Sequence, residues 1–525
     1  MSRRSGRLTR VTTTFPRAHA LSTRRLRLLL RILRVVAALA AVAALAGPPC
    51  PMVPDGPPVL ADCASTGPPL RYVVLFDAET PAQQAARAVR TACGTSTAYY
   101  PQIGVAVAIS GDPTFRARFG TDRAYSAQAE ALASPQRSEL ASPIVPATAA
   151  PSTATRVPGA AQALGADRSA EQWDMMLIHA AQARAINRGS PQVLVGVLDS
   201  GVDATHPDLA TAVDPTRSAG CLSGSPDQAP SAWSPSTSAH GTHVAGTIAA
   251  ADDGHGITGV APGVRLASVK VVDDDGFIYP EYAVCGFMWA ARQHIRIANS
   301  SYSLDPWLLT CSDVPGQAVA YEAVRRAVQY ATAYGVLSIA AAGNERMDLA
   351  NPRQDLRSPD NAPDPRPRPV DRHCNVLPAE LPGVVAVSAI GAQRVKSDYS
   401  SYGSGVIGVT APGGDSAQPS GPGSSGCVLS TVPGGYGYLC GTSMAAPHAS
   451  GVAALLASVR PEAGPRELAT LLRNQADPLP CPAGSSDLDD RNDPAATCAG
   501  EAGNAFYGHG LVDALTAVTS QPAAG

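Results

Sequence analysis

The sequence predicts an α/β fold: a doubly wound, mostly parallel sheet with helices on both faces, preceded by a small α+β unit. Two observations predict it. Beyond about residue 190, apolar runs alternate with helical stretches, the pattern of a parallel sheet covered on both faces. Residues from about 126 to 165 are rich in Ala, Pro, Ser and Thr, which is typical of a linker. We therefore expect two folded parts, with a linker and a processing site over residues 136–165.

The first 46 residues are typical of an export signal. Ten arginines and no acidic residue occupy the first 34 positions, and the apolar run 35–46 ends in the small-residue motif 44-ALA-46. This run is short for a bilayer span, so we expect cleavage near Ala46 and a secreted protein without a stable membrane anchor. The alternative is an uncleaved anchor. The pair Arg24-Arg25 leaves the general and twin-arginine routes open. Without this segment the chain is acidic, which disfavours nucleic acid as a partner.

The folded parts can be placed element by element. In the N-terminal part, 72-YVVLF-76 and 103-IGVAVAI-109 read as strands and residues 81–92 as a helix. The larger part has strand candidates at 193–199, 265–272, 295–301, 336–343, 384–390 and 405–411, and helices near 241–251, 281–293, 316–333 and 443–459. The polar, proline-rich residues 345–374 are expected to form a surface excursion.

The eleven cysteines favour disulfides in an oxidising compartment, because they include no CxxC pair and no zinc-like spacing. The sequence leaves most pairings open. Cys427–Cys440 and Cys481–Cys498 are the simplest expectations, because each closes a short loop that contains Gly and Pro.

The segment 441-GTSMAAPHASG-451 carries a candidate nucleophile. Its apolar continuation predicts a helix that begins close to Ser443, with Gly441 allowing a sharp turn into it and Pro447 within its first, unpaired turn. Free N–H groups and the helix dipole would favour negative charge beside Ser443. A serine at a helix start is ordinarily an N-cap, so a catalytic role requires a base and an orienting acid elsewhere.

Candidate partners lie at the ends of three other elements. A strand ends at Asp199, a helix of small residues opens at His240, and another strand ends just before Asn344. In doubly wound sheets, ligand chemistry gathers at the carboxyl ends of strands. Each residue alone has an ordinary structural explanation. His240 and His243 could also share a metal, but no third ligand is evident.

These segments closely resemble the subtilisin-like serine proteases (subtilases). DSGVDATHPDL, HGTHVAGT, AAGNE and GTSMAAPH match the family's Asp, His, oxyanion-Asn and Ser motifs, in the order known for subtilisin. The resemblance runs from about residue 172 to 520. It implies catalytic roles for Asp199, His240, Ser443 and Asn344, and a catalytic domain over residues 166–520. Residues 47–135 would be a propeptide that acts as an intramolecular chaperone and inhibitor.

The resemblance also implies a substrate groove and a calcium site. Polypeptide would bind between two edges, 276-GFI-278 (Gly276, Phe277) and Ser301-Tyr302-Ser303, with Ala341, Ala342 and Gly343 lining the first specificity pocket. Ser303 stands where the family usually has glycine, so no residue preference carries over. A structural calcium would be bound by the side chains of Asp208 and Asp253 and the carbonyls of Ala251, His255 and Ile257; the alternative is an ordinary acidic turn.

The sequence thus predicts a monomeric secreted serine endopeptidase that needs no cofactor for catalysis and is made as a self-processing zymogen. Two alternatives remain: a dedicated maturation protease that cuts one leader or precursor, and a catalytically inactive subtilase-fold binding protein.

Overall fold

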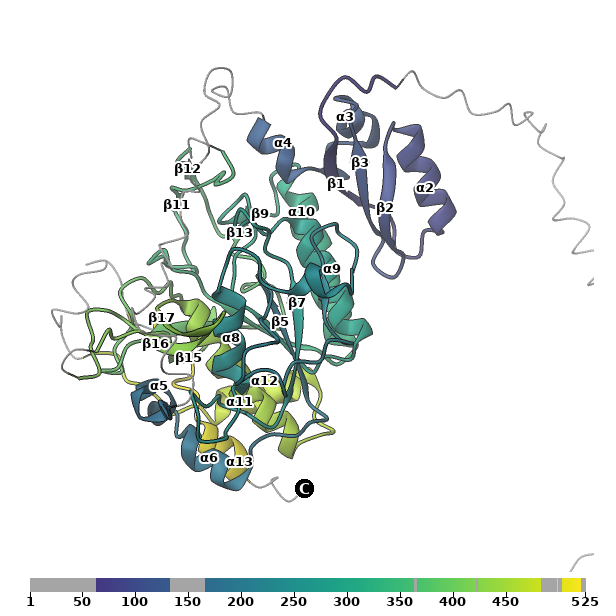
Figure 1. Ribbon diagram of the computed structural model, residues 1–525. Helices are drawn as coiled ribbons and strands as arrows, with labels where there is room; N and C mark the ends of the chain where they lie inside the picture. The colour runs from purple at the N-terminus through teal and green to yellow at the C-terminus, as the bar shows by residue number, and fades with distance from the viewer. Residues whose placement is uncertain are drawn as a thin grey trace, which may run out of the picture. The chain divides into compact units, whose positions relative to one another are not determined.

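The larger part of the chain is built on one seven-stranded sheet (Figure 1). The computed structural model describes residues 63–132, 166–362, 366–421, 424–482, 498 and 503–520. The expected export signal and the linker at 136–165 lie outside these described residues. All the described residues belong to one compact unit that begins at Ala61.

The seven strands run in the order β15-β14-β10-β8-β5-β7-β6, and every neighbouring pair is parallel. The central strands are buried along their whole length, as continuous apolar runs predict. The six expected strands all form. The bounds are β5 Leu194–Asp199, β6 Ala219–Gly220, β7 Arg265–Lys270, β8 Ile297–Ser300, β10 Leu337–Ala341, β14 Val384–Ile390 and β15 Ile407–Pro412.

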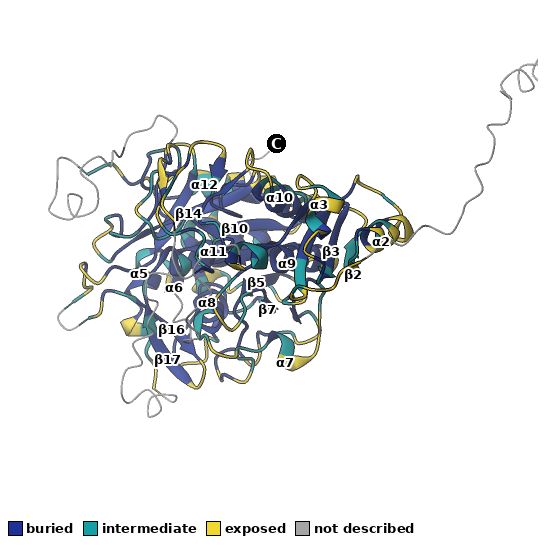
Figure 2. Ribbon diagram, turned by 90° about the horizontal axis from the view of Figure 1, so that it is seen from above, coloured by how far each residue is buried: buried dark blue, intermediate teal, exposed yellow. Residues whose placement is uncertain are grey.

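Helices cover both faces of this sheet, which confirms the doubly wound α/β class (Figures 1 and 2). One apolar core joins the sheet to α8 (His240–Ala249), α11 (Thr442–Val459), α12 (Pro465–Asn474) and α13 (Ala514–Thr519). A second core joins the opposite face to α9 (Pro280–Arg292) and α10 (Gln317–Ala333). The smaller elements are η2 Ser169–Glu171, α5 Trp173–Leu177, α6 Ala180–Ile186, α7 Pro230–Trp233 and the hairpin β16 Val428–Val432 with β17 Gly435–Leu439.

Residues 63–132, called the N-terminal unit below, form a four-stranded antiparallel sheet in the order β2-β3-β1-β4. Alternate residues of β1 face opposite ways: Tyr72 and Val74 belong to the unit's own core, whereas Val73 and Leu75 belong to the core of α9 and α10. The unit is therefore packed on these two helices. Its elements are β1 Leu70–Leu75, α2 Ala82–Thr91, β2 Thr95–Tyr100, β3 Val105–Ser110, α3 Phe115–Phe119, β4 Ala124–Tyr125 and α4 Ala127–Leu132.

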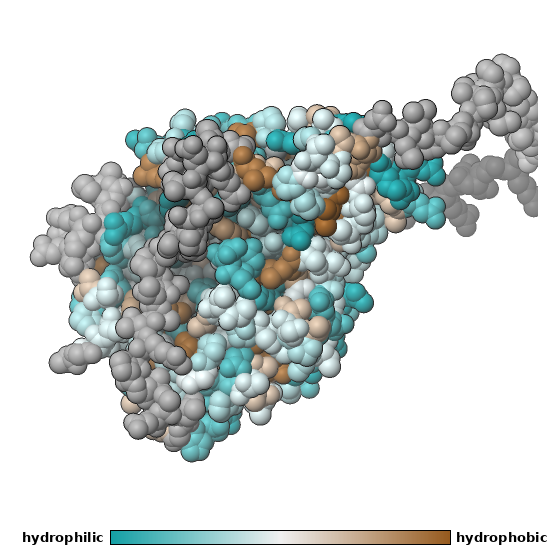
Figure 3. Space-filling model, turned by 45° about the horizontal axis from the view of Figure 1, so that its top comes forward, coloured by the Kyte–Doolittle hydropathy of each residue, from teal (hydrophilic) through white to brown (hydrophobic). Residues whose placement is uncertain are grey.

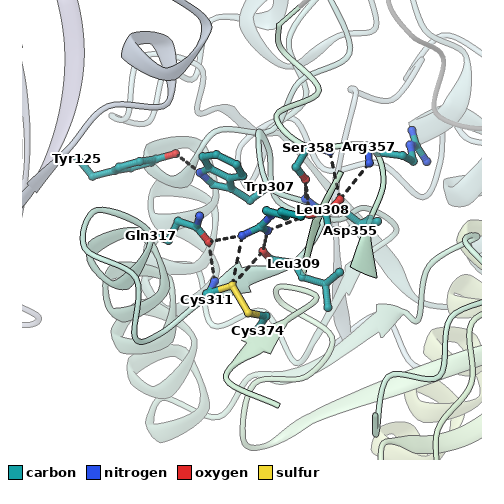
Figure 4. Close-up of polar contacts among 11 residues, drawn as sticks. Tyr125, Trp307, Leu308, Leu309, Cys311, Gln317, Asp355, Arg357, Ser358 and Cys374 are labelled. Atoms are coloured by element: carbon teal, nitrogen blue, oxygen red, sulfur yellow. Dashed lines mark hydrogen bonds and ion pairs between the residues drawn. A yellow bond between two sulfur atoms is a disulfide. The ribbon is translucent and has the colours of Figure 1, made fainter. Parts of the chain in front are cut away.

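Residues 345–374, called the insert below, are less superficial than the sequence suggests. The carboxylate of Asp355 is fully buried and pairs with Arg368 Nη2 at 2.8 Å. Arg368 also lies over the ring of Trp307, whose Nε1 donates to Tyr125 Oη at 2.7 Å (Figure 4). The prolines and charged residues of the insert predicted a solvated loop. In the structure, the opposite charges of Asp355 and Arg368 pair with each other, which allows this part of the insert to be buried. The short strands in this region are β9 Thr310–Cys311, β11 Gln354–Asp355, β12 Arg368–Pro369 and β13 Cys374–Asn375.

Five disulfides cross-link the described cysteines. The two local pairs, Cys427–Cys440 and Cys481–Cys498, form as expected. The other three are Cys63–Cys93, Cys221–Cys285 and Cys311–Cys374. Among the described helices, none combines the length and the apolar character that crossing a membrane requires. On the face shown in Figure 3, hydrophobic residues form small separate patches among hydrophilic ones.

Candidate active site

The predicted site residues meet at the carboxyl ends of neighbouring strands. Asp199 ends β5, Ser301 follows β8 and Asn344 follows β10. In the sheet, β5 has β7 as its neighbour on one side and β8 on the other. The chain forms β7 first and then crosses over to form β8, so the direction of winding reverses at β5. A doubly wound sheet opens a crevice at such a switch point. Two helices begin at the same edge, α8 at His240 and α11 at Thr442.

Asp199 holds the ring of His240. His240 Nδ1 lies 2.8 Å from Asp199 Oδ1 and 3.0 Å from Oδ2, so Nδ1 carries the proton and donates it. The carboxylate is 1% exposed and also accepts the N–H of Ser200 at 2.7 Å. The side chain of His240 is 19% exposed, so the ring is only partly covered.

Two opposing effects set the basicity of His240. Burial lowers the pKa of the imidazole, while the charge of Asp199 and its hydrogen bond raise it; the net result is a pKa above the ordinary histidine value. A raised pKa makes the ring a stronger proton acceptor. It also means that the neutral form needed for a general base appears only above that pKa.

Pro447 lies deeper in helix α11 than the sequence suggested. The helix begins at Thr442, so Pro447 lies beyond the first turn, and the expectation that its position is unpaired was wrong. An N–H at this position would bond the carbonyl of Ser443, four residues earlier. That carbonyl instead accepts Ser301 Oγ at 2.9 Å. Ser301 therefore satisfies the group that the proline leaves free.

The bond between these two serines is reciprocal, since Ser443 Oγ donates to the carbonyl of Ser301 at 3.1 Å. Within the described residues, no hydrogen bond joins Ser443 Oγ to His240 Nε2. Catalytic hydrogen bonds are often loose without substrate, so the lack of this bond does not argue against the predicted role of Ser443.

Asn344 and Ser443 present two donors to one point. Asn344 Oδ1 accepts the backbone N–H and the hydroxyl of Thr442 at 2.9 and 2.8 Å, which fixes the amide with Nδ2 outward. A Cβ added to Gly441 would lie 3.6 Å from Asn344 Nδ2, 3.6 Å from Ser443 N and 3.8 Å from Asn344 Oδ1. Gly441 is extended (φ 160°, ψ 160°), so the sharp turn that the sequence suggested at this position does not form.

The two predicted groove edges are linked by a residue that sequence reasoning missed. Asp305, four residues after Ser301, accepts the N–H of Ile278 on Oδ2 at 2.6 Å, and its own N–H donates to the carbonyl of Ile278 at 2.9 Å. Tyr302 is buried and Ser303 is half-buried. Asp305 lies just outside the segment 301–303 that was predicted to form a groove edge. No motif in the sequence included it, so sequence reasoning had no signal for it.

The predicted pocket segment Ala341–Gly343 runs from the end of β10 toward Asn344. Ala341 and Ala342 are buried, and the N–H of Gly343 donates to Thr442 Oγ1 at 3.2 Å. The neighbouring Glu345 was also missed by sequence reasoning. Burial raises its pKa, and the guanidinium of Arg357, at 2.9 Å, partly offsets that effect.

The two carboxylates predicted to bind calcium are engaged in hydrogen bonds within the chain. Tyr436 Oη donates to both carboxylate oxygens of Asp208, at 3.0 Å each, and Oδ2 also accepts the N–H of Ile257 at 3.1 Å. Asp253 is exposed and its Oδ1 accepts the N–H of His255 at 3.0 Å. Ala251 donates its N–H to the carbonyl of Asp208. Both carboxylate oxygens of Asp208 are therefore already hydrogen-bonded to the Tyr436 hydroxyl, which a calcium ion would have to displace or share.

His243, the second histidine of α8, has a structural role. Its Nε2 lies 3.1 Å from the carbonyl oxygen of Val428 and 3.2 Å from that of Gly437, so it donates to the β16–β17 hairpin. Burial lowers its pKa to about 3, which keeps the ring neutral. These contacts do not support a metal site shared with His240.

Comparison with known proteins places this arrangement in a family. The chain is 32% identical to fervidolysin from Fervidobacterium pennivorans over 330 residues, which span 59% of this chain and 41% of fervidolysin. It is 32% identical to subtilisin E from Bacillus subtilis over 272 residues, 51% of this chain and 56% of that protein. The matches thus span about half the length of these relatives.

A crystal structure of a lanthipeptide protease superposes with a TM-score of 0.50 at 26% identity, covering 66% of this chain and 94% of that one. The family model for Peptidase_S8, the subtilase family, matches residues 190–510, which include all four segments whose geometry is described above. The chain belongs to the subtilase family.

Proposed function

We propose that this protein is a serine endopeptidase in which Ser443 is the nucleophile, His240 the general base and acid, and Asp199 the residue that orients His240. Two observations carry this proposal: Asn344 Nδ2 and Ser443 N lie close to one point beside Gly441, and Asp199 is hydrogen-bonded to the ring of His240. An N-cap serine needs no such pair of outward donors, whereas an oxyanion does.

The proposed reaction has two halves. Ser443 Oγ attacks the scissile carbonyl carbon while its proton passes to His240 Nε2, and the carbonyl oxygen becomes an oxyanion held by Asn344 Nδ2 and Ser443 N. Collapse breaks the C–N bond; His240 gives the proton to the leaving amine, and an acyl-Ser443 ester remains. Water then attacks this ester by the same route and releases the acid. Asp199 stabilises the imidazolium in each half without taking the proton.

Labelling with a fluorophosphonate tests this assignment directly. We expect one adduct per chain on Ser443, and its loss in Ser443→Ala. The exposed loop residue Ser223 gives the control, because Ser223→Ala should label like the wild type. A wild-type protein that takes up no label would instead support the inactive binding protein.

The N-terminal unit is proposed to be an inhibitory propeptide, removed by self-cleavage. Arg326 Nη1 donates to the carbonyls of Phe76 and Ile103, and Tyr100 Oη donates to the carbonyl of Gly224, so the unit is hydrogen-bonded to the larger part. The N–H of Arg168 donates to Gly256 O at 2.7 Å, which makes residues near 168 part of the larger domain. The cut should therefore fall before residue 166.

N-terminal sequencing of secreted wild-type protein tests this proposal. Ser443→Ala should keep the N-terminal unit attached. If this variant is trimmed to the wild-type N-terminus in a host without other proteases, self-cleavage is wrong. Secretion itself is proposed from the sequence of the first 46 residues, and the five disulfides suit the oxidising compartment that it implies.

A dedicated maturation protease is the second candidate. Two observations favour it: Asp305 is hydrogen-bonded to Ile278 and so links the two predicted groove edges, and one similar structure is a lanthipeptide protease. Cleavage-site profiling on a mixed peptide library separates the two candidates. A broad profile supports a general endopeptidase, and cleavage restricted to one sequence motif supports a maturation protease.

A further inference from the structure

Asp305 fixes the distance between the two edges of the proposed groove. It is 8% exposed and makes both a side-chain and a backbone hydrogen bond to Ile278, at 2.6 and 2.9 Å. Ile278 ends the edge 276–278, and Asp305 follows the edge 301–303. The carboxyl group of Asp305 therefore joins the two edges between which a substrate strand would lie.

The insert brings a second carboxyl group to the first. The N–H of Asp360 donates to the carbonyl of Pro306 at 3.1 Å, and Ser358 Oγ accepts the N–H of Leu308 at 2.7 Å, so this part of the insert is bonded to the segment that follows Asp305. These contacts bring the buried side chains of Asp305 and Asp360 together, and each carboxyl group influences the pKa of the other. In Figure 4, Ser358 lies beside Leu308 and Asp355, where the insert is anchored.

Two neighbouring carboxyl groups can hydrogen-bond to each other only when one of them keeps its proton. Burial raises the pKa of Asp305 well above its ordinary range, and the nearby charge of Asp360 raises it further. Neutral Asp305 can then accept the Ile278 N–H on one oxygen and donate its O–H to Asp360 with the other. Asp360 Oδ1 is buried and receives no N–H or hydroxyl donor among the described residues, so it is open to that proton.

Other charged groups face the pair from two segments. Asp273, on the loop before the first edge, adds negative charge to Asp305 and is itself half-buried, with a pKa that burial raises. From the insert, Arg357 lowers the pKa of Asp360 and Asp355 raises it, although burial dominates and the net shift is upward. Because most of these neighbours are acidic, the surroundings favour retention of the shared proton.

We propose that Asp305 and Asp360 are a positioning pair that sets the width of the substrate groove for extended polypeptides. The insert supplies one half of this pair and thereby reaches the groove without touching the reacting atoms. The proposal rests on the proposed function, since it assumes that the edges 276–278 and 301–303 bind substrate. Small substrates that occupy only the first pocket would not depend on the pair.

Two variants separate the effect of the titrating proton on Asp305 from the effect of its contact with Asp360. Asp305→Asn can make both hydrogen bonds but has no proton that titrates. Its amide oxygen can accept the Ile278 N–H while its NH₂ donates to Asp360. Asp360→Ala removes the partner and leaves Asp305 buried alone. Asp313→Asn, at an exposed carboxylate outside the cluster, is the control for loss of one charge.

The assay compares KM and kcat for a five-residue peptide amide with those for a single-residue ester, from about pH 6 to about pH 10. For the peptide, Asp360→Ala should raise KM about 10-fold at all pH values, with kcat nearly unchanged, as expected for uniform binding that loses about one hydrogen bond. The ester should be hydrolysed alike by all variants. In the wild type, KM for the peptide should rise at alkaline pH, because deprotonated Asp305 would repel Asp360; Asp305→Asn should lack this rise and Asp313→Asn should keep it.

An unchanged peptide KM in Asp360→Ala, or an alkaline rise that persists in Asp305→Asn, would overturn the proposal. Fluorophosphonate labelling shows that each variant is folded and active. If the wild type neither labels nor hydrolyses the ester, the proposed function fails instead, and this outcome is distinct from a failure of the positioning pair.

Discussion

Replacing Gly441 by alanine should disable the oxyanion site without unfolding the protein. The added Cβ would lie 3.6 Å from both Asn344 Nδ2 and Ser443 N, which is ordinary van der Waals contact for a carbon atom. The backbone is extended at this position, so alanine causes little strain. An oxyanion needs to approach the same two donors to about 2.7–3.1 Å. The methyl group therefore competes for space with the transition state and with little else.

The size of the effect follows from the number of donors that are lost. Removal of one oxyanion donor costs about 10²–10³ in kcat, the loss measured for the oxyanion asparagine of subtilisin, a member of the same family. Asn344→Ala removes one donor and should show this loss, with KM little changed. Gly441→Ala obstructs both donors and should lose at least as much.

Steady-state kinetics on a peptide amide, together with thermal unfolding of each variant, provide the test. We expect a wild-type unfolding midpoint for Gly441→Ala and a kcat at least about 10²-fold lower. The same variant should still form the Asp199–His240 hydrogen bond. A Gly441→Ala enzyme with wild-type kcat would show that the two donors do not bind the oxyanion together, and the proposed geometry would be refuted.

Three other outcomes are expected. Activity should fall as pH drops through the pKa of His240, and a kcat/KM profile should place this pKa above the ordinary value of about 6.5, because an ion-paired imidazole keeps its proton to higher pH; a midpoint at or below that value would contradict the raised pKa. Arg368→Met leaves the fully buried carboxylate of Asp355 without its cationic partner. In urea titrations of an inactive background, it should lower the unfolding free energy by about 3–5 kcal/mol, whereas Arg372→Met, at an exposed position, should change it little. Equal effects of the two variants would argue against the buried pair. A chelator should leave the thermal half-life unchanged, because Asp208 is already hydrogen-bonded; a half-life that calcium restores would show that a cation does bind.

The elements of the larger domain were predictable because their signals are local. Continuous apolar runs such as β5 can be buried on both faces only in a covered parallel sheet, and small residues around His240 and Ser443 mark helices that pack closely. Short loops likewise allowed two disulfides to be assigned. The exact start of α11 was not predictable, since the carbonyl freed by Pro447 is satisfied by Ser301, a residue far away in the sequence.

Periodicity and short motifs were enough to establish the fold class, the order of the four motif residues and the family, because each of these can be recognised within a few consecutive residues. Three features depended on how the chain folds back on itself: which donors lie near a common point beside Gly441, that Tyr436 bonds Asp208, and that Asp360 reaches Asp305. Each of these is a contact between residues distant in the chain. Burial and pairing change the chemistry of such groups, and neither can be read from the residues on either side.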